Sequence, residues 1–477
     1  MTVCEEIGRW AAGLGPEQVP QPVTDRARLQ LASMLAARAA GEEAAAAVET
    51  VAAPGQIGEI YRNAAASIAH DWDDYLFMGH TGHSSVWTAV AFSSDPERAL
   101  TAQIAANEVA GRLGAALFLG PHNGQFWASI HCASAAVAAS IGLGLDAERT
   151  AHAVAIAMYQ PPYGMWPGFM GPSSKLLTAA EPSAQGARAA LLAREGMSGA
   201  LDVIEHPRGV LASLSFTPLP GMLGALGEVW LTETLAYKPR PGCAYLQAAI
   251  DAVLAAEVGA SDVSSIEIES GYLTCAMEEL SAGDELSPVR VNFSAALSCA
   301  VALIARRLTH EELRPEWLAD NEPAIRELAA RVSVRHDLEL TLATLRGTID
   351  AGVDLRGLGL GDWLAVGRGA RRAGLDDPQL GWDDLRELAV NPGLRRTLRD
   401  TLRRAPGRSP GPPTIEGVDT AAMRLTFPCR ARIRLGSGRV LEIDGDERGA
   451  CGRPLDEQRA VVEEKCRLTG VEVPVAY

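Results

Sequence analysis

The segment between residues 70 and 85, HDWDDYLFMGHTGHSS, holds the densest group of reactive side chains in the sequence. Imidazoles and carboxylates lie close together in it: His70, Asp71, Asp73, Asp74, His80 and His83. Groups of these two kinds shift one another's pKa, so the segment is suited to general acid–base catalysis. His80 and His83 could instead hold a metal ion with an aspartate, although their spacing alone is weak evidence for such a site. The structural alternative is a turn in which the aspartates accept hydrogen bonds from backbone N–H groups.

Lysines are the second set of candidates, because the chain has only three of them against forty arginines. Lys175 follows a Gly/Pro/Ser turn, where it could bind a substrate carboxylate or be a solvated residue at a helix start. Lys238 precedes two prolines and a helix, where it could complete an anion site or be an ordinary loop cation. Lys465 lies on a charged terminal helix and is interpreted as a background residue with no role in the site.

Composition narrows the class of protein. With 477 residues, 47% hydrophobic and 21% charged, the chain is long and apolar enough for a large core, so extensive disorder is excluded. The net charge of −16 and the mixing of arginines with acidic residues argue against a nucleic-acid partner. Eight scattered cysteines without a CxxC pair indicate the reducing cytoplasm. The N-terminus does not read as a signal peptide, and the most apolar stretch, 133–146, is too short for a membrane span.

Helices are expected to carry most of these residues. Up to about residue 260, alanine-rich segments with apolar residues three and four apart alternate with short Gly/Pro breaks. Beyond residue 262 the pattern mixes strands and helices. The predicted fold class is therefore mainly α, with a large all-α domain over 1–261 and a smaller α+β domain over 262–450 that contains a helical insertion near 340–425. A C-terminal helix in 451–477 is expected to return to the helical domain.

Individual elements can also be predicted from the pattern. Thr24 is a plausible N-cap of the helix TDRARLQLASMLAARAAG, and AAVAASIGLGLDAERTAHAVAIAM is interpreted as helical. The segments VSSIEIESGYL and RVSVRHDLELTL are interpreted as strands. CRARIRLGSGRVLEI predicts a β-hairpin that turns at residues 436–438.

Taken in order, these segments resemble the MmgE/PrpD family, which includes 2-methylcitrate dehydratase, cis-aconitate decarboxylase and an iminodisuccinate epimerase. Members carry a D-x-D-D-T…H-P-S stretch, an L-G-L-D helix end, an S-K segment, a K-x-Y-P-x-C…A-I-D-A stretch, an F-S pair and a G-x-P segment. The matching positions here are Asp71–Tyr75 with His83–Ser85, Leu143–Asp146, Ser174 and Lys175, Lys238–Cys243 with Ala249–Ala252, Phe293 and Ser294, and Gly452–Leu455. The similarity covers roughly residues 1–335 and 425–470.

The resemblance implies a large all-α domain and a smaller α+β lid, with the active site between them. Known members usually form dimers and need no metal or organic cofactor. Their substrates are small polycarboxylates, held by lysines and processed by histidine-centred acid–base chemistry. Carried over by position, the catalytic residues would be His83, Asp71, Lys175 and Lys238. His83 would then move a proton next to a carbonyl group.

Other positions depart from the family pattern, and with Asp73 and Asp74 they are expected to contact the substrate. Tyr75 stands where members often have Thr, Gln125 and Gln247 where they have His, and Leu297 where they have Tyr. Gln cannot act as an acid or base near neutral pH, although it can orient a substrate. His131 is six residues after Gln125, about 240° around a helix, so it is not a simple replacement. These changes predict a bulkier and less polar pocket.

The function predicted from these observations is a cofactor-independent lyase or isomerase that transfers a proton next to a carbonyl or carboxylate. Its substrate would belong to secondary metabolism, and ring closure is one possible reaction. The protein is predicted to be a cytoplasmic homodimer. No membrane or nucleic-acid partner is expected. This hypothesis requires His83, Lys175 and Lys238 to face one cavity. A non-catalytic family member would have no pocket with converging titratable groups. A metal-dependent hydrolase would use Asp73, Asp74, His80 and His83.

Overall fold

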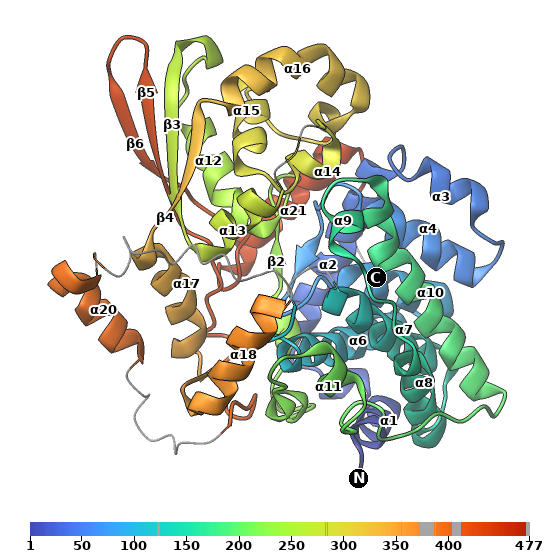
Figure 1. The fold of residues 1–477 in the computed structure, drawn as a ribbon. Helices are drawn as coiled ribbons and strands as arrows, with labels where there is room; N and C mark the ends of the chain where they lie inside the picture. Colours follow the sequence, from blue (N-terminus) through green and yellow to red (C-terminus); the bar gives the residue numbers. More distant parts are fainter. Residues whose placement is uncertain are drawn as a thin grey trace.

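The computed structural model has two parts, one helical and one built on a mixed sheet (Figure 1). This confirms the mainly α fold class with a smaller α+β part. The described residues are 1–121, 125–281, 283, 285–353, 355–372, 386, 388–402 and 412–473. In this portion of the chain, every helix is too short or too polar to cross a lipid bilayer.

The helical part is organised around one central helix, α7 (Gln125–Leu143). Alanine is the commonest residue among its described buried positions, and small side chains let helix backbones approach closely. The other helices of this part are α1 (Val3–Gly13), α2 (Gln21–Gly41), α3 (Ala46–Val51), α4 (Gln56–Ile68), α5 (Gly82–Phe92), α6 (Pro96–Ala116), α8 (Ala147–Tyr159), α9 (Trp166–Phe169), α10 (Leu177–Arg194) and α11 (Val210–Leu214). Of these, α1, α5, α6, α8 and α10 contact α7.

Two helix boundaries differ from the sequence prediction. The helix α2 begins at Gln21 after Pro20, so Thr24 lies inside its first turn and is not the N-cap. Pro22, in the first turn of α2, has the fixed φ that suits the start of a helix without a polar cap. The segment expected as one helical stretch divides into α7 and α8, because Gly144 adopts φ +67° and the Asp146 side chain accepts a hydrogen bond from Arg149 N at 2.8 Å.

The α/β part contains a four-stranded sheet in the order β4-β3-β5-β6. Its strands are β3 (Val263–Ser270), β4 (Val332–His336), β5 (Cys429–Leu435) and β6 (Val440–Asp444). The β3–β4 pair is parallel and the other two pairs are antiparallel. Helices α12 (Gln247–Ala255), α13 (Tyr272–Leu280), α14 (Pro288–Val291), α15 (Ala295–Ala305) and α16 (Pro315–Ala329) complete this part. Alternate residues of β3 and β5 are buried, so one face of the sheet forms a core with α12 and α15.

The strand predictions hold with two exceptions, the first being that Tyr272 and Leu273, at the end of the predicted strand VSSIEIESGYL, belong to the helix α13. VSSIEIES forms β3, and the hairpin is confirmed, with Gly438 at φ +87° in its turn. RVSVRHDLELTL is a strand only to His336, because the Asp337 side chain accepts a hydrogen bond from Leu340 N and caps the helix α17 (Leu338–Asp350). The sequence prediction places the end of the helical domain at residue 261, after the helix α12. In the structure, α12 packs against β5 and α15 and so belongs to the core of the α/β part.

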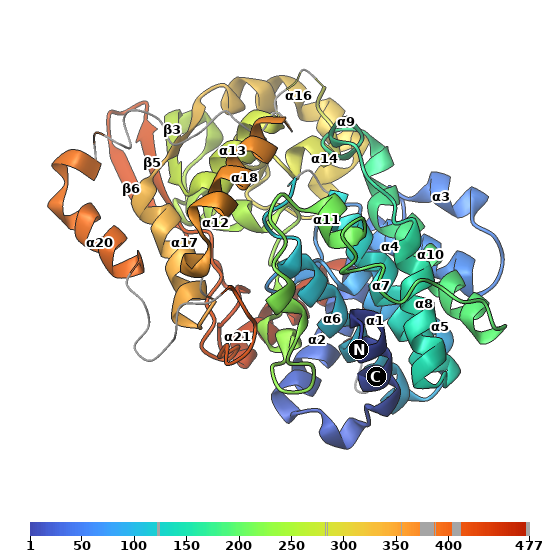
Figure 2. The ribbon, with the colours of Figure 1, turned by 60° about the horizontal axis from the view of Figure 1, so that its bottom comes forward.

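The helices that follow α17 take different directions. The helix α18 (Leu360–Arg372) lies beside the chain that follows α11, where Thr217 Oγ1 donates a hydrogen bond to the carbonyl of Asp362 at 3.1 Å (Figure 2). The helix α20 (Pro392–Leu402) contacts α17. The last helix, α21 (Leu455–Thr469), returns to the helical part and packs against α2. Lys465 of α21 is only 1% exposed, which corrects its interpretation as a background residue.

Candidate active site

A short two-stranded ladder brings the acidic segment beside Lys238. Strand β1 (Asp74–Tyr75) pairs antiparallel with β2 (Ala236–Tyr237), with Asp74 opposite Tyr237. The Trp72 indole N–H donates to the carbonyl of Lys238 at 3.1 Å. The acidic segment is therefore held inside the protein, where its charges need partners.

The turn after β1 places two histidines near one carboxylate. Leu76 and Gly79 exchange backbone hydrogen bonds of 2.9 and 3.3 Å, so the chain reverses just before His80. The helix α5 starts at Gly82 and carries His83 in its first turn. Both imidazole rings consequently approach Asp73.

Asp73 is the centre of the polar network. Its Oδ1 accepts a hydrogen bond from Lys238 Nζ at 2.5 Å, and its Oδ2 lies 2.6 Å from His80 Nδ1 and 3.2 Å from His83 Nε2. Burial acts to raise the pKa of Asp73, but Lys238 and His80 outweigh it and hold the pKa well below its usual value. Asp73 is therefore an anion at neutral pH.

The two histidines differ in how far their side chains are exposed to the cavity. An anionic Asp73 favours the tautomer of His80 that donates its Nδ1 proton, which makes Nε2 the basic nitrogen. The His80 side chain is 28% exposed, whereas that of His83 is 1% exposed. His83 Nδ1 lies 2.8 Å from Ser67 Oγ, so both of its nitrogens have protein partners. Burial lowers the pKa of His83 against the opposing effect of Asp73.

A second ion pair lies next to the first. Lys175 Nζ contacts Asp71 Oδ2 at 2.5 Å and the carbonyl of Ile68 at 3.0 Å. Lys175 precedes α10 in a short 3-10 turn, and Asp71 adopts φ +49°, a left-handed conformation that aspartate tolerates better than most residues. Lys238 Nζ also donates to the carbonyl of Asp71 at 2.6 Å.

His131 is a site residue that the sequence pattern does not identify. Its Nδ1 lies 2.9 Å from Ser84 Oγ, and its ring packs edge-on against His83 with the centroids 5.9 Å apart. Burial, with a contribution from His83, holds its pKa well below the usual value, so His131 is neutral at neutral pH. In the sequence, His131 is a titratable residue within an otherwise apolar helical stretch. That unusual setting is the one sequence feature that could have indicated a site residue here.

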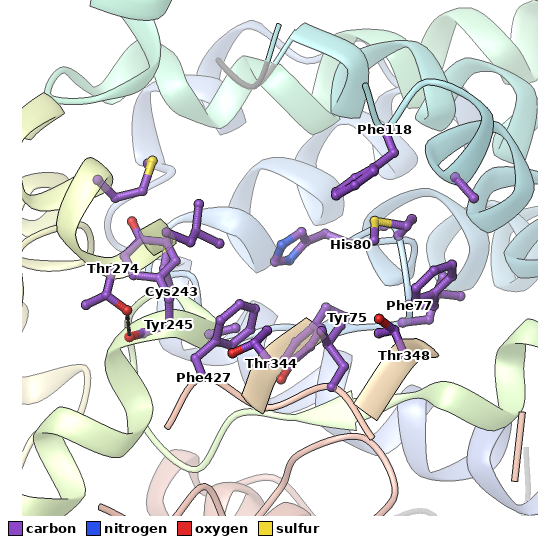
Figure 3. Close-up of a pocket in the computed structure, with 18 of the residues that line it drawn as sticks. Tyr75, Phe77, His80, Phe118, Cys243, Tyr245, Thr274, Thr344, Thr348 and Phe427 are labelled. Atoms are coloured by element: carbon purple, nitrogen blue, oxygen red, sulfur yellow. Dashed lines mark hydrogen bonds between the residues drawn. The ribbon is translucent and has the colours of Figure 1, made fainter. Parts of the chain in front are cut away.

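These groups open into a cavity of about 460 Å³ bounded by residues of both parts. The titratable part of its lining includes Asp71, Asp73, His80, His83 and His131. Figure 3 shows the His80 ring in the middle of the lining, with Phe118 on one side and Tyr75 and Phe427 on the other. Most of the remaining wall is apolar, including Phe77, Met78, Trp166, Phe169, Leu219, Met222, Phe293, Leu345, Val353 and Leu355.

Comparison with known protein families agrees with this arrangement. The MmgE/PrpD N-terminal domain matches residues 60–220, and the MmgE/PrpD C-terminal domain matches residues 241–349. The chain belongs to the MmgE/PrpD family. Members of this family are generally enzymes, among them dehydratases and other lyases. No curated protein matched the chain in a direct search.

Lys175 and Lys238, which the family resemblance predicts to bind the substrate, do not line the cavity where the substrate would lie. Neither Lys175 nor Lys238 lines the cavity, and both side-chain exposures are 0%. Each lysine instead lies behind an aspartate that does line it. The requirement that His83 and both lysines face one cavity is therefore met by His83 alone.

The other residues expected to contact the substrate divide into two groups. Tyr75 lines the cavity and donates its hydroxyl proton to Glu447 Oε1 at 2.8 Å. Asp74 does not line it and accepts from Gln30 Nε2 at 2.6 Å. Gln247 donates to the backbone carbonyls of three neighbouring residues, and Leu297 packs on the core of the α/β part, so neither lines the cavity. The side chain of Gln125 lies outside the described residues.

The metal-site hypothesis gains no support from the geometry. Within the described ranges, no three His, Cys, Asp or Glu side chains are grouped as metal ligands. Asp73 interacts with both histidines directly, and Asp74 is hydrogen-bonded to Gln30. The four residues of that hypothesis therefore do not form one ligand set.

Two buried ionisable groups beside the site were not anticipated. Burial raises the pKa of Glu447 to about 7 and lowers that of Lys465 to about 7. Lys465 Nζ donates to Ser33 Oγ at 2.9 Å and to the carbonyl of Trp72. Both residues come from the segment after β6, and only the packing of that segment against the helical part reveals them.

Proposed function

We propose that this protein is a lyase or isomerase that transfers a proton at a carbon next to a carbonyl or carboxylate group. The observation that carries the proposal is the Asp73–His80 pair, with its Nδ1–Oδ2 distance of 2.6 Å, in the lining of a largely apolar cavity. An imidazole oriented by an ionised carboxylate is an effective general base near neutral pH.

In this mechanism His80 Nε2 removes the proton and Asp73 stabilises the imidazolium that forms. The proton can return to another face or carbon of the substrate, which gives isomerisation. Alternatively, the carbanion equivalent can expel a leaving group from the next carbon, which gives dehydration, or attack a second site in the same molecule, which closes a ring. Each outcome needs one proton-transfer residue and a substrate held in a fixed orientation.

His83 has a positioning role in this proposal. The family resemblance favours His83 as the base, but its side chain is only 1% exposed, against 28% for His80, and its Nδ1 lies against Ser67 Oγ. His83 therefore helps to fix the Asp73 carboxylate, which in turn orients His80. By analogy with the family, we also propose that the protein forms a homodimer and needs no bound cofactor. The largely apolar lining of the cavity supports a substrate from secondary metabolism.

A non-catalytic role is the alternative from a different class. It predicts a pocket without converging titratable groups. Five such groups line this cavity, namely Asp71, Asp73, His80, His83 and His131. Clustering of this kind favours an active site over a binding-only pocket.

The test compares His80→Gln with His83→Gln for deuterium uptake into ketones and carboxylic acids in deuterated water, followed by mass spectrometry. We expect His80→Gln to lower exchange about a hundredfold or more with little loss of stability, because a general base contributes on this scale. His206 is exposed, so His206→Gln is the matched control. If His80→Gln exchanges as fast as the parent while a folded His83→Gln does not, then His83 is the base and the assignment is wrong.

A further inference from the structure

The charges around the cavity are already paired within the protein. Lys175 and Asp71 are 2.5 Å apart, and so are Lys238 and Asp73. Both aspartates line the cavity, and no described lining residue is a lysine or an arginine. An anionic substrate would therefore meet two carboxylates and, among the described lining residues, no lysine or arginine that could compensate its desolvation.

Much of the remaining lining of the cavity suits an apolar group. Successive turns of α17 contribute Thr341, Thr344, Leu345 and Thr348. Leu219 and Met222 from the helical part also line the cavity. A volume of about 460 Å³ is in the range that encloses a drug-sized molecule.

One polar group in the wall lacks a partner. The Tyr245 side chain lines the cavity and is only 7% exposed, yet its hydroxyl has no hydrogen-bond partner among the described residues. The neighbouring Cys243 thiol is at most a weak acceptor. Figure 3 shows Tyr245 beside Cys243 and Thr274 at one end of the lining, with His80 nearer the middle. A buried hydroxyl without a partner is costly, and a ligand oxygen that accepts its proton would remove that cost.

We propose that the cavity binds an uncharged, mostly apolar carbonyl compound whose carbonyl oxygen accepts a hydrogen bond from Tyr245. The inference rests on the proposed function in taking this cavity as the reaction site. The hydrogen bond would also stabilise the negative charge that develops on the carbonyl oxygen when His80 removes the neighbouring proton. No bond to the protein forms, and the proton passes from the substrate carbon to His80 Nε2.

Isothermal titration of the full chain with three probes tests the substrate class. The probes are 2-decanone, which is neutral, decanoate, which has the same chain length and one charge, and tricarballylate, a small tricarboxylate. We expect 2-decanone to bind about tenfold or more tightly than either anion, because each anion would be buried without a counter-charge. In Asp71→Asn, where Lys175 loses its counter-charge, decanoate should gain about threefold or more in affinity. Equal or tighter binding of either anion by the parent protein would overturn the proposal.

Tyr245→Phe tests the hydrogen bond. Because it removes a hydroxyl without a partner, the melting temperature should not fall, while the affinity for 2-decanone should fall about three- to tenfold. Tyr159 is 78% exposed, so Tyr159→Phe is the matched control. Unchanged affinity in Tyr245→Phe would remove Tyr245 from the site. Binding of 2-decanone without deuterium uptake would count against proton transfer and leave the substrate class standing.

Discussion

At the scale of residues, all three lysines donate hydrogen bonds to the chain between Ile68 and Asp73. Lys175 contacts the carbonyl of Ile68, Lys238 that of Asp71, and Lys465 that of Trp72. Each is 1% exposed. A lysine ammonium offers three donors on a compact group, so it can satisfy a carboxylate and a backbone carbonyl together, whereas the planar fork of arginine needs more room. The three lysines thus fix the backbone that carries Asp71 and Asp73.

Lys238→Met tests this role at its most buried ion pair. Removing the ammonium leaves Asp73 buried without its main counter-charge, so we expect a loss of about 3 to 5 kcal/mol in the free energy of unfolding, measured in urea. The pKa of Asp73 should rise, so residual exchange activity should recover as the pH is increased. Arg459 is exposed, and Arg459→Met is the control for loss of a positive charge. A cost below about 1 kcal/mol would contradict the interpretation.

The sequence predicts part of this arrangement. The scarcity of lysine and the flanking motifs point to Lys175 and Lys238, and both do lie against the acidic segment. What they bind could not be predicted, because lysine spacing does not reveal whether an internal carboxylate or a substrate provides the counter-charge. Lys465 was missed because its burial depends on where the terminal helix packs, and it lies 393 residues along the chain from Trp72, which it contacts.

At the scale of elements, the position of His80 depends on how closely α6 approaches the turn that precedes it. Gly114 of α6 lies against Met78, and a Cβ at this position would be 1.9 Å from the Met78 carbonyl oxygen. The turn therefore sits directly on the helix backbone. Strand and helix propensities predicted β3 and the β5–β6 hairpin, but the two-residue pair β1–β2 is too short to leave a pattern. The element that aligns the site was for that reason the least predictable.

Gly114→Ala tests this contact. The added methyl group should displace the turn that carries Met78, with a cost of about 1 to 3 kcal/mol in the free energy of unfolding and a larger relative loss of exchange activity. At Gly13, the last residue of α1, a Cβ would meet no atom within 4 Å, so Gly13→Ala should be neutral or slightly stabilising. Equal behaviour of the two variants, judged by urea unfolding and deuterium uptake, would show that the turn can move freely.

At the scale of the whole molecule, Glu447 connects the two parts beside the cavity. It follows β6 in the α/β part, accepts from the Tyr75 hydroxyl of the helical part, and accepts from Phe427 N at 2.8 Å. Burial raises its pKa from 4.5 to about 7, against the opposing effect of these hydrogen bonds. Between these two values the folded protein holds a proton that the unfolded chain has released. The free energy of unfolding therefore falls as the pH rises through this window.

Glu447→Gln should remove this pH dependence. Gln can accept from Tyr75 through its carbonyl oxygen, and its amide carries no charge that burial would penalise. From about pH 5 to about pH 8 the parent should lose about 2 kcal/mol more stability than the variant, measured by urea unfolding at each pH. Glu463 is exposed, and Glu463→Gln should follow the parent. Parallel curves for the parent and Glu447→Gln would mean that Glu447 is ionised throughout.

The burial of every lysine also makes the folded chain unusual toward amine-reactive reagents. Acylating compounds that label most proteins at surface lysines would find only the N-terminal amine of the folded chain, because the three lysine amino groups are buried against the acidic segment. Lysine labelling would thus mark molecules that have opened, and the order in which Lys175, Lys238 and Lys465 become reactive would report which part separates from that segment first. Because the sequence has only three lysines and all three are buried, lysine labelling reports unfolding specifically.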